Sequence, residues 1–150
     1  MITVLENCSP PKFVASIPAS KREIHSLATV GSTVWSGSAE AVISIWDPKK
    51  FKLKKTLKGH IALIKVILPL PITTNDKKPI VWSGDVEGWV HVWKGTTPAY
   101  RFQIQGGQPV STMVYNEASK SVWIGSFKCI FVYDSIVRSI FTLQSLGCLF

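Results

Sequence analysis

One motif occurs three times in this sequence, and the repetition limits the fold more than any other feature. In each copy a tryptophan (Trp35, Trp82 or Trp123) precedes a glycine by two positions. A second aromatic residue follows the tryptophan at 11, 11 and 10 positions, as Trp46, Trp93 and Tyr133. The copies start 47 and 41 positions apart. A period of about 40–45 residues is typical of proteins that stack one supersecondary unit beside the next.

Each copy is predicted to form β-structure. An apolar run leads into a glycine turn, and a second run rich in β-branched and aromatic residues follows, which is the pattern of a hairpin. One further strand is expected on either side of each hairpin; in the last repeat the outer one is expected at Ser139–Leu143. Four strands in about 40 residues are typical of one blade of a β-propeller. The sequence therefore predicts an all-β fold, a partial β-propeller of about three four-stranded antiparallel blades, not closed, over residues 20–58, 60–105 and 108–145.

The composition is that of a packed domain. Apolar residues make up 46% of the 150 residues, which excludes a chain that is disordered throughout. The net charge of +8 leaves nucleic acid or an anionic membrane open as partners. Cys8, Cys129 and Cys148 show no Cys-x-x-Cys spacing, so we expect neither a disulfide framework nor a zinc site, and a reducing, cytoplasmic compartment. Cys129 is expected to be a small core residue within a strand.

No segment has the pattern of an export signal or a membrane anchor. The N-terminal residues lack a basic start followed by a long apolar run. The most apolar stretch, residues 61–72, contains a lysine and two prolines and is shorter than the roughly 20 residues of a membrane-spanning helix.

The repeats resemble those of the WD-repeat (WD40) β-propeller family, whose third strand ends in Trp-Asp. The resemblance covers about residues 20 to 145 and is carried by Trp35–Ser38 with Trp46-Asp47, by Ser83-Gly84 with Trp93, and by Gly59-His60. In this family a loop histidine, a strand serine or threonine, a turn aspartate and the tryptophan form a stabilising network.

The resemblance assigns this network to particular residues of the first two repeats. In the second repeat they are His60, Ser83, Glu87 and Trp93, with glutamate in the place of aspartate. In the first repeat they are Ser36, Glu40 and Trp46, with Ser20 near the position of the histidine. At the corresponding positions the third repeat has Gly107, Ile124, Lys128 and Tyr133. It therefore lacks the network, and we expect its stability to depend on apolar packing. The first tryptophan of each repeat is expected to pack one blade against the next.

Motifs for catalysis are not found. His25, His60 and His91 lie in different repeats, and the chain has neither a phosphate-binding glycine loop nor a Gly-x-Ser-x-Gly turn. We therefore expect no enzyme activity, no cofactor and no metal.

Six lysines fall within residues 49–58. On a regular strand, Lys52, Lys54, Thr56 and Lys58 would share one face, and Phe51, Leu53 and Leu57 the other. The lysines could protect an outermost strand from pairing. Alternatively, Lys52, Lys54 and Lys58 could contact an anionic membrane surface. Nucleic acid is the weaker expectation, because the segment lacks arginines and interleaved exposed aromatic residues.

Three blades are fewer than the four to eight that propellers typically use, so apolar blade faces would stay open. We expect a segment of a longer chain, or a ring completed by a second copy or another chain. The predicted function is a non-catalytic protein-interaction scaffold whose loops bind partners. Candidate loop residues are Trp89, Asp85, Lys58 and Gln108. The alternatives are an anionic-membrane-binding propeller or the accessory propeller of a multidomain signalling enzyme, such as a Rho guanine nucleotide exchange factor, a kinase or an inositol-phosphate phosphatase.

Overall fold

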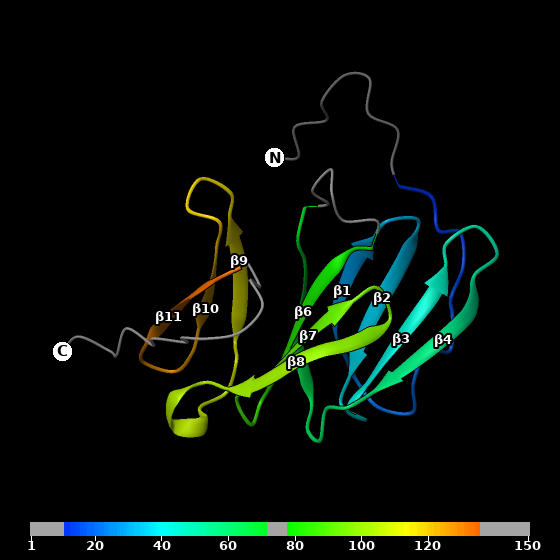
Figure 1. Cartoon of the computed structure of the whole chain (residues 1–150). Coiled ribbons are helices and arrows are strands. Elements are labelled where there is room, and N and C mark those ends of the chain that lie inside the picture. Colours follow the sequence, from blue (N-terminus) through cyan, green and yellow to red (C-terminus); the bar gives the residue numbers. More distant parts are fainter. Residues whose placement is uncertain (1–10, 72–77, 136–150) are drawn as a thin grey trace, which may run out of the picture.

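The computed structural model describes residues 11–71 and 78–135, which form three antiparallel β-sheets (Figure 1). The first sheet contains β1 (Ile24–Val30), β2 (Thr33–Ser38), β3 (Val42–Asp47) and β4 (Lys52–Lys58). The second sheet contains β5 (Ile64–Pro69), β6 (Ile80–Asp85), β7 (Trp89–Lys94) and β8 (Thr97–Gln103). The third sheet contains β9 (Thr112–Asn116), β10 (Ser121–Gly125) and β11 (Ile130–Asp134), and a 3-10 turn (Gln105–Gly107) precedes it.

Strands that follow one another in the chain are also neighbours in each sheet. This order follows from the short turns, which allow only antiparallel pairing between consecutive strands. The fold is therefore all-β and propeller-like, and its sheets do not close into a ring. The strand expected at Ser139–Leu143 lies outside the described residues.

Two apolar cores join the sheets. Trp35, Ile43 and Ile45 of the first sheet form one core with Ile64, Ile67 and Trp93 of the second. Trp82, Val90 and Val92 of the second sheet form the other core with Met113, Val122 and Ile124 of the third. The packing role predicted for the repeated tryptophan is confirmed for Trp35 and Trp82, whereas Trp123 points away from the second sheet and is exposed.

A glycine allows each pair of sheets to approach closely. A Cβ atom on Gly37 would lie 2.6 Å from Cγ2 of Ile64, and one on Gly84 would lie 2.4 Å from Cγ1 of Val110. Both distances are shorter than real contacts, so a larger residue at these positions of β2 and β6 would force the neighbouring side chains to move. The repeated glycine of the motif is thus a packing feature.

The strand β4 departs from regular alternation. Trp46 pairs with Leu53 and Ile45 pairs with Lys55, so Lys54 is the extra residue of a β-bulge. The bulge places Leu53 on the face of Trp46, and Lys55 on the face of Ile45.

The two-face prediction for the lysine segment is therefore wrong. Because the bulge shifts the register by one residue, Lys52 and Lys58 lie on opposite faces, as do Leu53 and Leu57. Leu57 is the buried residue of β4, and the other six are exposed.

Cys129 lies in the turn before β11 rather than within a strand, and it is disulfide-bonded. Its side chain is half-buried and packs against the core between the second and third sheets, so the expected core contact is confirmed. The expected position within a strand is wrong, and the expectation of cysteines without a disulfide does not hold for Cys129. Within residues 11–71 and 78–135, no helix is long and apolar enough to cross a membrane.

Candidate functional site

A chain of buried hydrogen bonds links the loop before β5 to the strands of the second sheet. Trp93 Nε1 donates to Ser83 Oγ over 2.9 Å, and Ser83 Oγ lies 2.7 Å from His60 Nε2. His60 Nδ1 lies 2.6 Å from Asp85 Oδ2. With the proton of His60 on Nδ1, the ring donates to the carboxylate and accepts from the Ser83 hydroxyl, so every group in the chain is satisfied.

The acid of this network is Asp85, and the prediction of Glu87 is wrong. Asp85 is fully buried, and its second oxygen accepts the backbone N–H groups of Glu87 and Trp89, each over 3.0 Å. The Glu87 side chain is exposed, and Glu87 contributes to the network only through its backbone N–H. Its carbonyl accepts a hydrogen bond from Gln103 Nε2. Burial also overturns the expectation that Asp85 is a partner-binding loop residue, because no partner could reach its side chain.

The first sheet contains a shorter version of the network. Trp46 Nε1 donates to Ser36 Oγ over 2.8 Å. Ser38 occupies the position of Asp85, accepts the Glu40 N–H and donates to the carbonyl of Val42. The Glu40 side chain is exposed and accepts from Ser20 Oγ instead, so its predicted place in the network is wrong.

His91 belongs to this site and was not predicted. It lies opposite Ser83 across β6 and β7, with its ring centroid 4.1 Å from that of His60. The ring also stacks on Trp93 at 5.7 Å. Burial, reinforced by repulsion from His60, lowers the pKa of His91 to about 4. The cross-strand register places it beside Ser83, and that register could have identified it.

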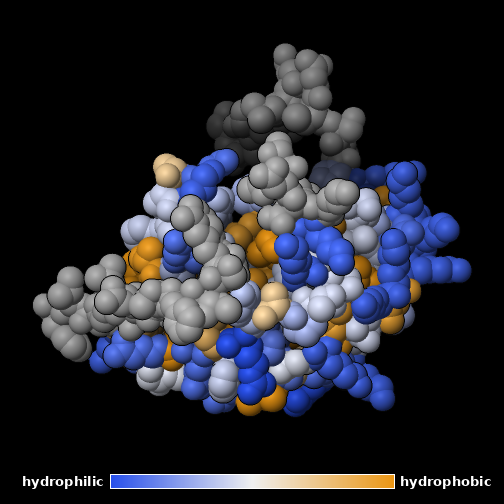
Figure 2. Space-filling view, viewed as in Figure 1, coloured by the Kyte–Doolittle hydropathy of each residue, from blue (hydrophilic) through white to orange (hydrophobic). Residues whose placement is uncertain are grey.

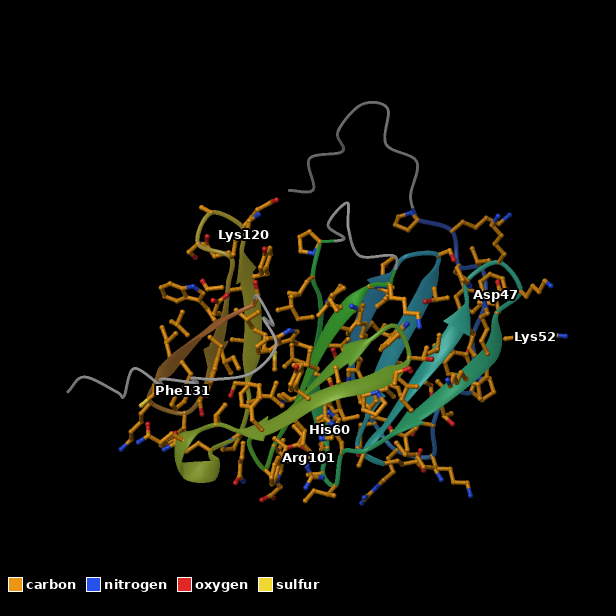
Figure 3. All side chains as sticks on the ribbon, viewed as in Figure 1. Asp47, Lys52, His60, Arg101, Lys120 and Phe131 are labelled. Carbon is orange, nitrogen blue, oxygen red and sulfur yellow. The ribbon has the colours of Figure 1, made fainter. Side chains whose placement is uncertain are left out.

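At the edge of the network, the structure brings Trp89 and Arg101 together. The Arg101 guanidinium carbon lies 4.7 Å from the centroid of the Trp89 ring, as in a cation–π contact. Figure 3 shows Arg101 beside His60 at the same end of the molecule. Trp89 is half-buried and Arg101 is exposed, so the pair is accessible to a partner.

The other two predicted loop residues lie on different sheets or loops. Lys58 ends β4 and is exposed. Gln108 follows the 3-10 turn, is half-buried, and accepts a hydrogen bond from Ser126 Oγ over 3.5 Å.

The strand β4 (Lys52–Lys58), here called the lysine strand, forms a hydrophilic border along one side of the molecule (Figure 2). Lys52, Lys54 and Lys58 are all exposed, and Lys52 points away from the sheet (Figure 3). Asp47, at the start of the β3–β4 turn, accepts the backbone N–H groups of Lys49 and Lys50. These hydrogen bonds lower the pKa of Asp47. Its carboxylate thus holds the turn that leads into the lysine strand.

Metal-binding geometry is not found in the described part of the chain. No group of three or more His, Cys, Asp or Glu side chains there could hold a metal ion.

No protein-family model and no curated protein matches this sequence. Among solved structures, the chain is similar to the computationally designed Ika8 protein, with 25% sequence identity and a TM-score of 0.64. That match covers 88% of this chain and 38% of the Ika8 chain, so this chain spans well under half the length of that protein. The chain is also similar in fold to the computationally designed Ika4 protein, with 23% identity and a TM-score of 0.62, over 83% of this chain and 74% of that chain.

Proposed function

We propose that this chain is a WD-repeat-type β-propeller segment that acts as a protein-interaction scaffold and not as an enzyme. In this proposal the three sheets are propeller blades. The linkage of His60, Ser83, Asp85 and Trp93 supports it, because these are the residue types of the WD-repeat network in contact with one another.

The observation that carries the proposal is how the polar residues divide between core and surface. The histidine, serine and aspartate of the network are buried and bonded to one another, so they hold the fold. At the surface of the same end, Trp89 and Arg101 present an aromatic ring and a guanidinium group. Tryptophan and arginine are enriched among the residues that dominate binding energy at protein interfaces.

The side chains of Trp89 and Arg101 favour a particular kind of partner. A carboxylate can accept two hydrogen bonds from the Arg101 guanidinium while an apolar side chain packs on Trp89. The net charge of +8 also favours approach of an acidic chain. We therefore assign this surface to an acidic protein segment with an apolar residue beside its carboxylates.

This assignment is tested with a displayed library of short peptides rich in Asp, Glu and aliphatic residues. Binders selected on the protein should lose at least tenfold in affinity with Trp89→Ala and with Arg101→Ala. Phe51→Ala, at an exposed aromatic residue of another turn, is the matched control and should retain binding. Equal affinity for the wild type and both site variants would refute the assignment.

The lysine strand supports a second function, contact with an anionic membrane. Phe51 and Leu53 are exposed among the lysines, so this edge combines positive charge with apolar side chains that could enter the headgroup region. In a full propeller the same lysines could simply protect an edge strand from pairing.

Sedimentation with phosphatidylserine-containing vesicles separates these two roles of the lysines. The variant Lys52→Glu/Lys54→Glu/Lys58→Glu should stay in the supernatant. The control Lys12→Glu/Lys21→Glu/Lys128→Glu changes the net charge equally at exposed sites elsewhere and should still bind. The membrane role is rejected if the wild type does not sediment, or if the two variants behave alike.

A further inference from the structure

The outer face of the third sheet is apolar and open. It presents Val114, Trp123, Ile130 and Val132, all of them exposed. The strand register makes these residues the counterparts of Ala28, Trp35, Ile43 and Ile45 in the first sheet. Trp35 is 2% exposed and Trp82 is 3% exposed, because another sheet covers each of them, whereas Trp123 is 40% exposed.

The opposite end of the molecule carries an apolar surface of the complementary kind. Ile24 and Leu27 of β1 are 37% and 69% exposed on the outer side of the first sheet. Their counterparts by register in the second sheet are Ile64 and Ile67, which are 0% and 6% exposed beneath the first sheet.

The two open faces are therefore the two halves of one type of interface. The molecule forms this interface twice already, between its first and second sheets and between its second and third. In the former, Ile64 covers Gly37. The third sheet offers Gly125 at the register of Gly37, and the first sheet offers Ile24 at the register of Ile64.

We propose that a second copy of this chain completes both faces. The first sheet of each copy packs on the third sheet of the other, with Ile24 and Leu27 of one copy against Gly125 and Trp123 of its mate. This inference rests on the proposal that the sheets are propeller blades. Six is the one multiple of three within the usual range of four to eight blades, so two copies would close a ring. Because each contact joins two different faces, the assembly is head-to-tail and ends when the ring is complete.

The test is the mass of the chain in solution, measured by sedimentation velocity and light scattering over a series of concentrations. The wild type should have twice the 16.6 kDa mass of one chain. Trp123→Asp, which damages the third-sheet face, should be monomeric at concentrations where the wild type is a dimer. Leu27→Asp, which damages the first-sheet face, should have the same effect. Ile61→Asp is the matched control, because it changes an exposed apolar residue in the loop before β5 and should leave the dimer intact.

Mixing the two monomeric variants gives the decisive result. The intact first sheet of the Trp123→Asp chain can still meet the intact third sheet of the Leu27→Asp chain, so the mixture should recover a dimer that neither variant forms alone. Recovery also proves that both variants are folded.

The inference is wrong if the wild type is monomeric at every concentration or forms a species larger than a dimer. It is also wrong if Leu27→Asp still dimerises, or if the mixture of the two variants stays monomeric. Peptide binding by Trp89 and Arg101 is measured separately, so failure of the dimer and failure of the proposed scaffold function are distinguishable.

Discussion

The first and second sheets each contain a tryptophan–serine hydrogen bond, but only in the second sheet do a histidine and an aspartate extend it. In both, a tryptophan of the third strand donates to a serine of the second strand, over 2.8 Å from Trp46 and 2.9 Å from Trp93. In the second sheet His60 and Asp85 extend that bond, whereas Ser38 stands at the position of the aspartate in the first. The tryptophan–serine pair therefore forms without the histidine–aspartate pair. The latter has a different role, which is to tie the loop before β5 to the β6–β7 turn.

Removing the Asp85 carboxylate should destabilise the second sheet far more than removing the Ser38 hydroxyl destabilises the first. Asp85→Ala leaves His60 and two backbone N–H groups without their buried acceptor, so we expect a loss of about 3–5 kcal/mol in the free energy of unfolding. Ser38→Ala removes the corresponding hydroxyl from the first sheet and should cost about 1 kcal/mol. Urea denaturation measures both values. Similar losses from the two variants would mean that the histidine–aspartate pair adds nothing to the second sheet.

The pH dependence of stability should come from the second sheet as well. The pKa of His91 is about 4 in the folded chain and about 6.5 when unfolded, so the unfolded chain binds the extra proton between these values. Stability is therefore complete above pH 6.5 and decreases towards pH 4, by at most about 3 kcal/mol. The charged and titratable groups that act on His91 are His60, Asp85 and Arg101.

Thermal unfolding across this pH range, compared with His91→Gln, tests the sign and the source of the change. In the His91→Gln variant, stability should change much less with pH between pH 4 and 6.5 than in the wild type. An unchanged slope would assign the effect to other groups.

The motif glycines of the three sheets, Gly37, Gly84 and Gly125, should differ in how well they tolerate alanine. Gly84→Ala and Gly37→Ala push a Cβ atom into the next sheet and should each cost about 1–3 kcal/mol. At Gly125 the nearest atom is Cγ2 of Thr112, an exposed side chain of its own sheet that can rotate, so Gly125→Ala should be milder. Denaturation of the isolated chain under monomeric conditions gives the ranking. A Gly125→Ala variant as damaging as Gly84→Ala would contradict this account.

The smallest expected effect concerns the indole of Trp82. The equivalent Trp35 and Trp123 donate to hydroxyls two residues earlier, on Thr33 and Ser121. Ile80 occupies that position in the second sheet, and Trp82 Nε1 is buried without a partner. Ile80→Thr should supply the acceptor.

The control for this change is Ile80→Val, which also removes a methyl group but adds no hydroxyl. Thr should exceed Val in unfolding free energy by about 1 kcal/mol. A Thr variant less stable than the Val variant would show that the indole is not reached.

The repeat itself allowed much of the fold to be predicted. The hairpins, the sheet packing of Trp35 and Trp82, and the partnership of Trp93 with Ser83 follow from spacing and period. The pattern does not single out Asp85 as the acid of the network, because Glu40 and Glu87 align in the two turns while Asp85 aligns with Ser38.

Other features depend on information that a linear pattern does not contain. The bulge at Lys54 breaks the period of two on which the strand faces were predicted. The pKa of His91 depends on the burial of its ring beside His60. The exposure of Trp123 depends on what lies beside the third sheet, since Trp123 stands between a valine and a Gly-containing turn just as its buried counterparts do.

The bulge has a counterpart in the second sheet, where Val92 pairs with Tyr100 and Trp93 with Pro98, so that Ala99 is the extra residue of β8. Both outer strands thus carry the same irregularity at the same place. A bulge coils an edge and interrupts its row of free amides and carbonyls, so a passing extended chain finds no flat template on which to polymerise. In the first and second sheets the outer strand therefore carries a barrier to amyloid-like growth that does not depend on the lysines.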